Sequence, residues 1–299
     1  MEVKPIDAPC GAEISSIDLT QQLEMAQIAE IRRAWLDYHV LVFPDQAISI
    51  HDLARFTLYF GKFGNDPFFK PIEDHKNIAA IRRDADEQTP LFAENWHTDW
   101  SFQPKPPIGT CLYGVKIPPR GGDTLFSNQH MAYDDLPIEL KQRVENLTAI
   151  HSAASGYSPD GIYSNQKEQN VGRSMEIIIS EEARRTCSHP LIRLHRETGR
   201  PAIYSTAGYI ERFEELNVTR SRVNSTAGYI ERFEELSVLE SKDLLRKLYR
   251  YQGSELFVYR HQWKSNMLVM WDNRSVLHKA TGGYEGYDRL LYRTTISEF

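Results

Sequence analysis

The sequence has few cysteines and no excess of positive charge, and each shortage excludes a class of protein. Cys10, Cys111 and Cys187 are the only cysteines among 299 residues, and they lie far apart. Neither a disulfide framework nor a structural zinc site made of thiolates is therefore expected. The formal net charge is −6, whereas a nucleic-acid-binding protein usually carries a basic surplus or a basic stripe. A nucleic-acid partner is not expected either.

Long apolar runs are also missing. The longest runs have four or five residues, as at 40–43, whereas a membrane-spanning helix needs about 20. The first residues show no apolar signal-peptide core. We therefore expect a cytoplasmic protein without a membrane partner. No stretch rich in Gly, Ser or Pro divides the chain, so residues 1–299 are expected to form a single domain.

The hydrophobic pattern predicts helices near the start of the chain and short strands after them. Apolar residues recur at helical spacing over 22–38 and 50–60, and the apolar run 40–43 between them predicts a buried strand. Further strand-like pieces, separated by Gly, Pro and Asn, lie at 109–115, 124–126, 177–179, 255–259, 267–271 and 289–296. This order favours a mainly β, α+β fold: a sandwich or barrel with flanking helices.

A histidine and an aspartate stand two residues apart at His97 and Asp99. On an extended strand both side chains point to one face and can take neighbouring positions around a metal ion. Many such pairs are surface residues, so the pair alone is a weak signal. With His278, which follows the strand candidate 267–271, the set matches the two-histidine, one-carboxylate triad of non-heme Fe(II) oxygenases.

Two arginines share one face of the predicted strand 289–296. Arg289 and Arg293 are four residues apart, and two inward-facing arginines would be costly unless an anion met them. A 2-oxo acid chelated to the metal would supply such an anion, because its remote carboxylate needs a fixed cation, which arginine can provide bidentately. The alternative is that both arginines flank the strand in solvent.

Taken together, these segments resemble the taurine dioxygenase/TfdA-like family of Fe(II)- and 2-oxoglutarate-dependent dioxygenases. The resemblance covers nearly the whole chain and is most specific from Trp-Asp-Asn-Arg at 271–274 to Arg293. It is also carried by Gly-Ala-Glu-Ile at 11–14, Phe-Gly-Lys-Phe-Gly at 60–64 and Gly-Gly-Asp-Thr at 121–124. The fold that it implies is a double-stranded β-helix, or jelly roll.

The resemblance also implies roles for individual residues. His97, Asp99 and His278 match the iron ligands of the family. Thr124 matches the hydroxyl donor to the distal carboxylate of 2-oxoglutarate, and Arg289 matches the arginine that pairs with that carboxylate. Fe(II) is thus the implied metal, 2-oxoglutarate and dioxygen are the implied cosubstrates, and a homo-dimer or homo-tetramer is common in the family.

The substrate pocket is expected to combine aromatic rings with one cation. The candidate residues are Phe68, Phe69, Trp100, Phe102 and Arg293. Arg293 matches an arginine that lies near the substrate anion and the cosubstrate in the sulfonate-using members. Those members also contact the substrate through a histidine in the region that here reads Asn-Asp-Pro-Phe-Phe-Lys, so taurine is doubtful as the substrate. A small anionic molecule with an apolar or aromatic body would suit such a pocket, unless Phe68 and Phe69 are merely core residues.

The expected reaction is oxidation of that small molecule, with hydroxylation as the default outcome and release of succinate and carbon dioxide. Desaturation or oxidative decarboxylation in secondary metabolism is the alternative within the class. Asp99 disfavours halogenation, because related halogenases have a small residue at that position. Outside the class, a zinc hydrolase would use the same three ligands but would leave Thr124 and Arg289 unexplained. A catalytically silent jelly-roll binding protein would be expected to have lost one of the ligands, whereas all three are present here.

Twelve residues of the sequence occur twice. Ser-Thr-Ala-Gly-Tyr-Ile-Glu-Arg-Phe-Glu-Glu-Leu spans 205–216 and recurs letter for letter at 225–236, an offset of 20 residues. Such identity indicates a recent tandem duplication or an error in the sequence. Two units are too few for a solenoid. The expected organisation is therefore one jelly-roll domain that carries a duplicated segment around 205–236.

Deleting residues 205–224 is expected to leave a folded protein, because the second copy would then directly follow Tyr204. Thermal unfolding and Fe(II) binding, compared between the deletion variant and the intact chain, measure this. Loss of cooperative unfolding or of iron binding in the variant would show that the extra copy is structural.

Overall fold

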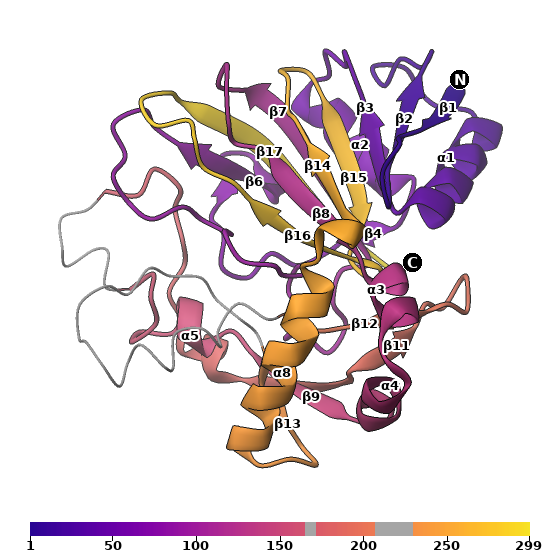
Figure 1. Ribbon diagram of the computed structural model, residues 1–299. Helices are drawn as coiled ribbons and strands as arrows, with labels where there is room; N and C mark the ends of the chain where they lie inside the picture. Colours follow the sequence, from indigo (N-terminus) through magenta and orange to yellow (C-terminus); the bar gives the residue numbers. More distant parts are fainter. Residues whose placement is uncertain (165–171, 207–229) are drawn as a thin grey trace.

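The structure is a computed structural model that describes residues 1–164, 172–206 and 230–299 (Figure 1). Its centre is a nine-stranded sheet with the strand order β1-β2-β3-β15-β7-β17-β6-β5, in which β4 also pairs with β17. All neighbouring strands are antiparallel except β2 and β3. The strands are β1 Glu2–Pro5, β2 Ala12–Ser15, β3 Val40–Phe43, β4 Lys62–Phe63, β5 Pro71–Ile72, β6 His75–Arg83, β7 Gly109–Lys116, β15 Leu268–Asp272 and β17 Arg289–Ser297.

A smaller antiparallel sheet packs on one face of the large sheet. Its strand order is β14-β8-β16, formed by Val258–His261, Thr124–Asn128 and Val276–Ala280. Phe126 and Val276 of this sheet share a buried cluster with Leu112 of β7 and Leu291 of β17. The two sheets form the jelly roll that the sequence led us to expect, and the mainly β fold class is confirmed.

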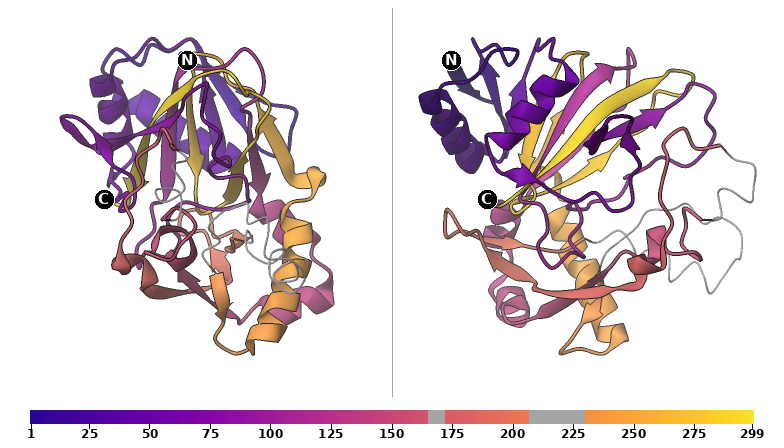
Figure 2. Two further views of the ribbon diagram at one scale, coloured as in Figure 1. Left: turned by 90° about the vertical axis from the view of Figure 1, so that its left-hand side faces the viewer. Right: turned by 180° about the vertical axis from the view of Figure 1, so that it is seen from behind.

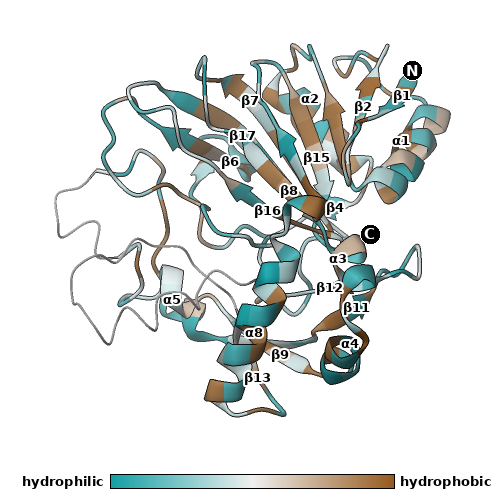
Figure 3. Cartoon of the chain, viewed as in Figure 1, coloured by the Kyte–Doolittle hydropathy of each residue, from teal (hydrophilic) through white to brown (hydrophobic). Residues whose placement is uncertain are grey.

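The strand β3 is apolar throughout because both of its faces are buried. In β3, Leu41 and Phe43 belong to the core beneath the helices α1 (Met25–Tyr38) and α2 (Ile50–Leu58). Val40 and Val42 point the other way, into the core between the two sheets. Side chains of a strand alternate between its faces, so covering both faces produces the unbroken apolar run. Figure 3 shows that hydrophobic residues are frequent, among hydrophilic ones, on the strands of the large sheet.

A second group of elements lies below the two sheets in the view of Figure 1, and Figure 2 shows it from two other sides. It has a separate core that includes Val144, Phe233, Leu244 and Leu248. Its helices and strands are α3 Gln129–Asp135, α4 Ile138–Val144, α5 Ala154–Tyr157, α8 Val238–Gln252, β9 Thr148–Ser152, β10 Thr186–Pro190, β11 Ile192–Leu194, β12 Pro201–Ile203 and β13 Ile230–Phe233. Two 3₁₀ helices, Glu181–Arg184 and Glu255–Phe257, complete the described elements.

Several sequence-based expectations about these elements are corrected. The segment 177–179 is not a strand, because only Ile177 pairs, in an isolated bridge with Phe69. The segment 255–259 divides into a 3₁₀ turn and β14. Helices also occur late in the chain, and α8 has 15 residues and a capping box between Ser237 and Glu240. The cap and the helical spacing of Leu244 and Leu248 were readable signals.

The duplicated segment falls mostly outside the described residues, which exclude 207–229. The end of the second copy is described, and its residues Ile230–Phe233 form β13, which pairs with β9. Of the helices within the described ranges, none has the length and apolar character needed to cross a membrane.

Candidate active site

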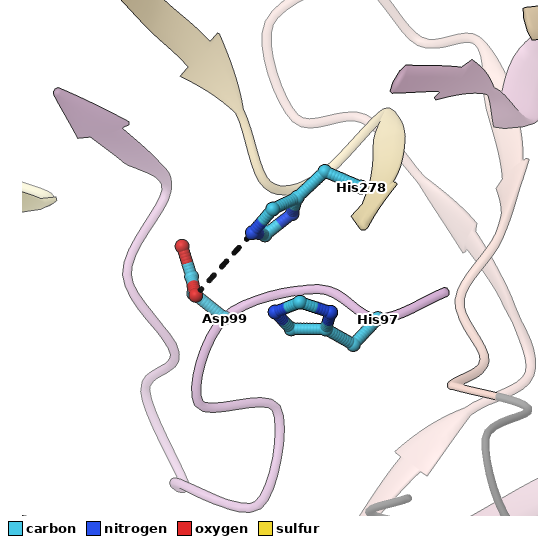
Figure 4. A group of neighbouring side chains, drawn as sticks. All are labelled: His97, Asp99 and His278. Atoms are coloured by element: carbon cyan, nitrogen blue, oxygen red, sulfur yellow. Dashed lines mark ion pairs between the residues drawn. The ribbon is translucent and has the colours of Figure 1, made fainter. Parts of the chain in front are cut away.

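Backbone pairing brings the predicted metal ligands together. His97 precedes β7 in the sequence and forms an isolated antiparallel bridge with His278 of β16. The His97 amide donates to the His278 carbonyl at 3.0 Å, and the His278 amide donates to the His97 carbonyl at 2.8 Å. Contrary to expectation, Asp99 lies in a turn and not on an extended strand. It nevertheless points toward the two imidazoles (Figure 4).

The three side chains form a compact donor set. One ligand atom from each of His97, Asp99 and His278 can be chosen so that all three lie within 4.8 Å of one another. The His278 Nε2 atom is 3.8 Å from Asp99 Oδ1. In the described part of the chain, no other cluster of three or more His, Cys, Asp or Glu residues has this geometry.

The protonation states suit a divalent cation. Burial lowers the pKa of His97 and lowers that of His278 well below its usual value, which favours neutral imidazoles with a free lone pair. Burial raises the pKa of Asp99, but the positive charge of Arg293 and the hydrogen bond from Thr110 act in the opposite direction, and the pKa is lowered to about 2. His97 Nδ1 lies 2.9 Å from the Asn95 carbonyl oxygen. Donation to that oxygen leaves the Nε2 lone pair of His97 for a metal.

A buried chain of hydrogen bonds orients the Asp99 carboxylate. The Thr110 hydroxyl donates to Asp99 Oδ2 at 2.5 Å, and Asn273 Nδ2 donates to Thr110 Oγ1 at 2.9 Å. Trp271 Nε1 in turn donates to Asn273 Oδ1 at 2.9 Å. Sequence reasoning assigned no role to Thr110 and noticed Asn273 only within the Trp-Asp-Asn-Arg motif. Because Thr110 occupies Oδ2, Oδ1 is the oxygen left to face the histidines.

Arg289 is a buried cation with an unused donor. The residue is 7% exposed, and its Nη2 donates to the Gly122 carbonyl oxygen at 3.0 Å. Its Nε has no hydrogen-bond partner, and no carboxylate forms an ion pair with it within the described ranges. Gly122 has a φ of +69°, and a Cβ there would lie 3.1 Å from Arg289 Nε. The alternative that this arginine flanks the strand in solvent is therefore excluded.

Thr124 of β8 lies on the same cavity as Arg289 and the three metal-ligand candidates. Its Oγ1 accepts a hydrogen bond from Trp263 Nε1 at 2.9 Å, so the hydroxyl proton is left to donate. A hydroxyl donor and an incompletely satisfied guanidinium on one cavity suit a carboxylate ligand. The residues present therefore fit 2-oxoglutarate.

The cavity has an empty volume of about 870 Å³, including its opening to solvent. Apolar and aromatic side chains make up much of its wall: Phe69, Ile81, Leu91, Phe92, Trp100, Leu112, Tyr157 and Met175.

The five candidate substrate residues divide into two groups. Phe69, Trp100 and Arg293 line the cavity. Phe68 and Phe102 are absent from the described lining and pack behind it, in the aromatic cluster around Trp100. The Phe68 ring stacks on Tyr157 with a centroid distance of 4.6 Å. The side chain of Arg293 is 5% exposed and lies between two carboxylates, because its Nη2 is 2.9 Å from Asp99 Oδ1 and its Nη1 is 3.3 Å from Asp66 Oδ1. Sequence reasoning did not single out Asp66.

Known proteins of one family match nearly the whole chain. The family described as "Taurine catabolism dioxygenase TauD, TfdA family" matches residues 2–295. The chain belongs to this family. It is therefore a 2-oxoglutarate-dependent non-heme iron dioxygenase that uses Fe(II), 2-oxoglutarate and dioxygen and oxidises a small organic substrate.

Individual relatives of this dioxygenase span nearly its whole length. Pentalenolactone F synthase of Streptomyces avermitilis is 32% identical, and the match covers 97% of this chain and 91% of the relative. The α-ketoglutarate-dependent 2,4-dichlorophenoxyacetate dioxygenase of Cupriavidus pinatubonensis is 30% identical, with coverage of 92% and 90%. Among solved structures, a taurine dioxygenase from Burkholderia xenovorans is similar with a TM-score of 0.76 at 27% identity, covering 100% of this chain and 89% of that one. AAD-2 in complex with Mn(II) and N-oxalylglycine has a TM-score of 0.73 at 25% identity, covering 100% and 97%.

Replacing Thr110 with valine is expected to weaken Fe(II) binding by roughly 10–100-fold, because Asp99 Oδ2 loses the donor that orients the carboxylate. Valine has nearly the same shape as threonine, so the fold should persist. Competition for Fe(II) with a chelator measures the affinity. Thr110→Ser, which keeps the hydroxyl, is the matched control. An unchanged Fe(II) affinity in Thr110→Val would contradict the orienting role.

Proposed function

We propose that His97, Asp99 and His278 hold the Fe(II) of this dioxygenase and that the cavity beside them binds the substrate to be hydroxylated. The observation that carries this proposal is the convergence of two neutral imidazoles and one ionised carboxylate on the wall of a single cavity. When bound, Fe(II) and 2-oxoglutarate supply the oxidising chemistry, with succinate and carbon dioxide as products. Desaturation would need the same residues and a different placement of the substrate.

Arg289 and Thr124 are proposed to hold the distal carboxylate of 2-oxoglutarate. The support is the buried Arg289 guanidinium with an unused Nε and the Thr124 hydroxyl, whose proton is free to donate. An anion in this place would neutralise a charge that burial makes unfavourable. A zinc hydrolase would give no reason for this buried cation. The buried Arg289 guanidinium therefore favours an oxygenase over a zinc hydrolase.

The substrate is proposed to lie against Phe69 and Trp100, with Phe68 and Phe102 supporting these rings from behind. An apolar wall of this kind excludes water and orients the C–H bond that reacts. The names of two relatives support a substrate with an aromatic or apolar body, since one acts on 2,4-dichlorophenoxyacetate and another on (S)-phenoxypropionate. The expectation of an anionic substrate relied on Arg293, which the structure places in ion pairs with Asp66 and Asp99.

We further propose a cytoplasmic location and a single catalytic domain over residues 1–299. All three cysteines are free, which suits a reducing compartment. A homo-dimer or homo-tetramer, implied by the resemblance to the family, stays a prediction.

Anaerobic addition of Fe(II) and 2-oxoglutarate to the apoprotein is expected to produce a weak visible charge-transfer band. The band should be lost in Asp99→Ala and in His278→Ala, because each variant removes one proposed ligand. Absorption spectroscopy measures it, and circular dichroism confirms that the variants fold. A folded wild-type protein that shows no band under these conditions would refute the proposed site.

Replacing Arg289 with alanine is expected to weaken 2-oxoglutarate binding by about 3 kcal/mol, roughly a hundredfold or more, because the distal carboxylate loses its cation in a buried place. Anaerobic titration of the charge-transfer band with 2-oxoglutarate measures the affinity. Arg82→Ala is the matched control, since Arg82 also borders the cavity but is paired with Asp84. Equal losses in the two variants would argue against a specific role for Arg289.

A further inference from the structure

The two arginines on the inward face of β17 differ in what surrounds them. Arg289 keeps an unused Nε and has no ion pair within the described residues. Arg293 lies 3.3 Å from Asp66 Oδ1 and 2.9 Å from Asp99 Oδ1. One cation therefore still needs an anion, whereas the charge of the other is compensated by the protein.

The side chains around Arg293 hold it in place. Its guanidinium carbon lies 5.0 Å from the centre of the Phe69 ring and 5.2 Å from the Trp100 ring system. Trp100 Nε1 donates a hydrogen bond to Asp66 Oδ1, the same oxygen that faces Arg293. The Trp100 indole thus positions both partners of the ion pair: Arg293 lies against its ring, and Asp66 accepts from its N–H.

Of the two carboxylates that pair with Arg293, Asp66 is the one that is not a proposed metal ligand. A metal bound by Asp99 would share the negative charge of that carboxylate, so Asp66 would become the main counterion of Arg293. Burial raises the pKa of Asp66, and Arg293 and the Trp100 N–H act against that rise. Each of the two buried charges, the Asp66 carboxylate and the Arg293 guanidinium, is therefore stabilised by the other. An anionic ligand that displaced Asp66 would leave a carboxylate in a buried place without its cation.

We propose that Asp66 is a specificity-determining residue, which neutralises Arg293 so that the part of the substrate lying against Arg293, Phe69 and Trp100 is uncharged. This inference rests on the proposed function, because it concerns the substrate of the same site. It changes the role expected of Arg293 from a receptor for the substrate's anion to one half of an internal pair. The only free anion received by the inward face of β17 is then the carboxylate at Arg289.

The test compares acids with their amides, which have nearly the same shape and no charge. The probes are phenoxyacetate with phenoxyacetamide and phenylacetate with phenylacetamide. Each is titrated anaerobically into the protein loaded with Fe(II) and 2-oxoglutarate, and binding is read from the change in the charge-transfer band and from the shift in thermal unfolding. The variant is Asp66→Asn, which keeps the size of the side chain and an oxygen to accept from Trp100. Asp84→Asn is the matched control, because Asp84 also pairs with an arginine on the cavity, Arg82.

We expect Asp66→Asn to shift the selectivity toward the acid by about tenfold or more in at least one pair, because the charge of Arg293 becomes available. Asp84→Asn should leave the selectivity unchanged. Adding Arg293→Gln to Asp66→Asn should remove the gain. A folded Asp66→Asn protein whose selectivity is unchanged, or which binds no acid, would overturn the inference. If wild-type protein gives no charge-transfer band, the proposed function fails instead, so the two failures can be told apart.

Discussion

The active site depends on the reciprocal backbone hydrogen bonds between His97 and His278. These two bonds hold a loop residue against β16, although the two residues are far apart in the sequence. Once the backbones are paired, the centres of the two imidazole rings lie 4.1 Å apart. Asp99, two residues beyond His97, then brings its carboxylate within 4.8 Å of a ligand atom on each histidine. The sandwich supplies the rest, since β16 is held by β8 and the Asp99 carboxylate is oriented from β7 through Thr110.

The different surroundings of the two arginines explain how the cavity keeps one of them for a ligand anion. Arg289 and Arg293 are chemically identical and share one strand face, yet the protein supplies a carboxylate to the second and only a carbonyl to the first. A buried charge without a partner is unfavourable, so the unpaired arginine is prepared for a ligand. A related site could accept an acid beside the metal by changing the residue that corresponds to Asp66.

Much of the secondary structure was predictable wherever a segment has two buried faces or one clear apolar stripe. The strand 40–43 and the helix at 25–38 are such cases. The prediction of a strand at 177–179 was wrong although three consecutive isoleucines are typical of a strand. Ile177 and Ile179 pack against the cluster that includes Phe69, Ile178 is exposed, and only a single bridge forms. Of the aromatic pair at 68 and 69, one ring lines the cavity and the other packs behind it. The sequence alone does not show which of two adjacent aromatic residues in a loop faces the cavity.

The sequence by itself determined the chemical groups: a donor set suited to Fe(II), two arginines on one face of a predicted strand, and a motif pattern that resembles one family of oxygenases. Only the tertiary structure decided which partner each group meets. Asp66 reaches Arg293, and Asn273 reaches Thr110, across distances in the chain that no local pattern encodes. The physical reason is that spacing along a strand determines the face on which a side chain lies. The strand or loop that is packed opposite determines whether its charge is compensated.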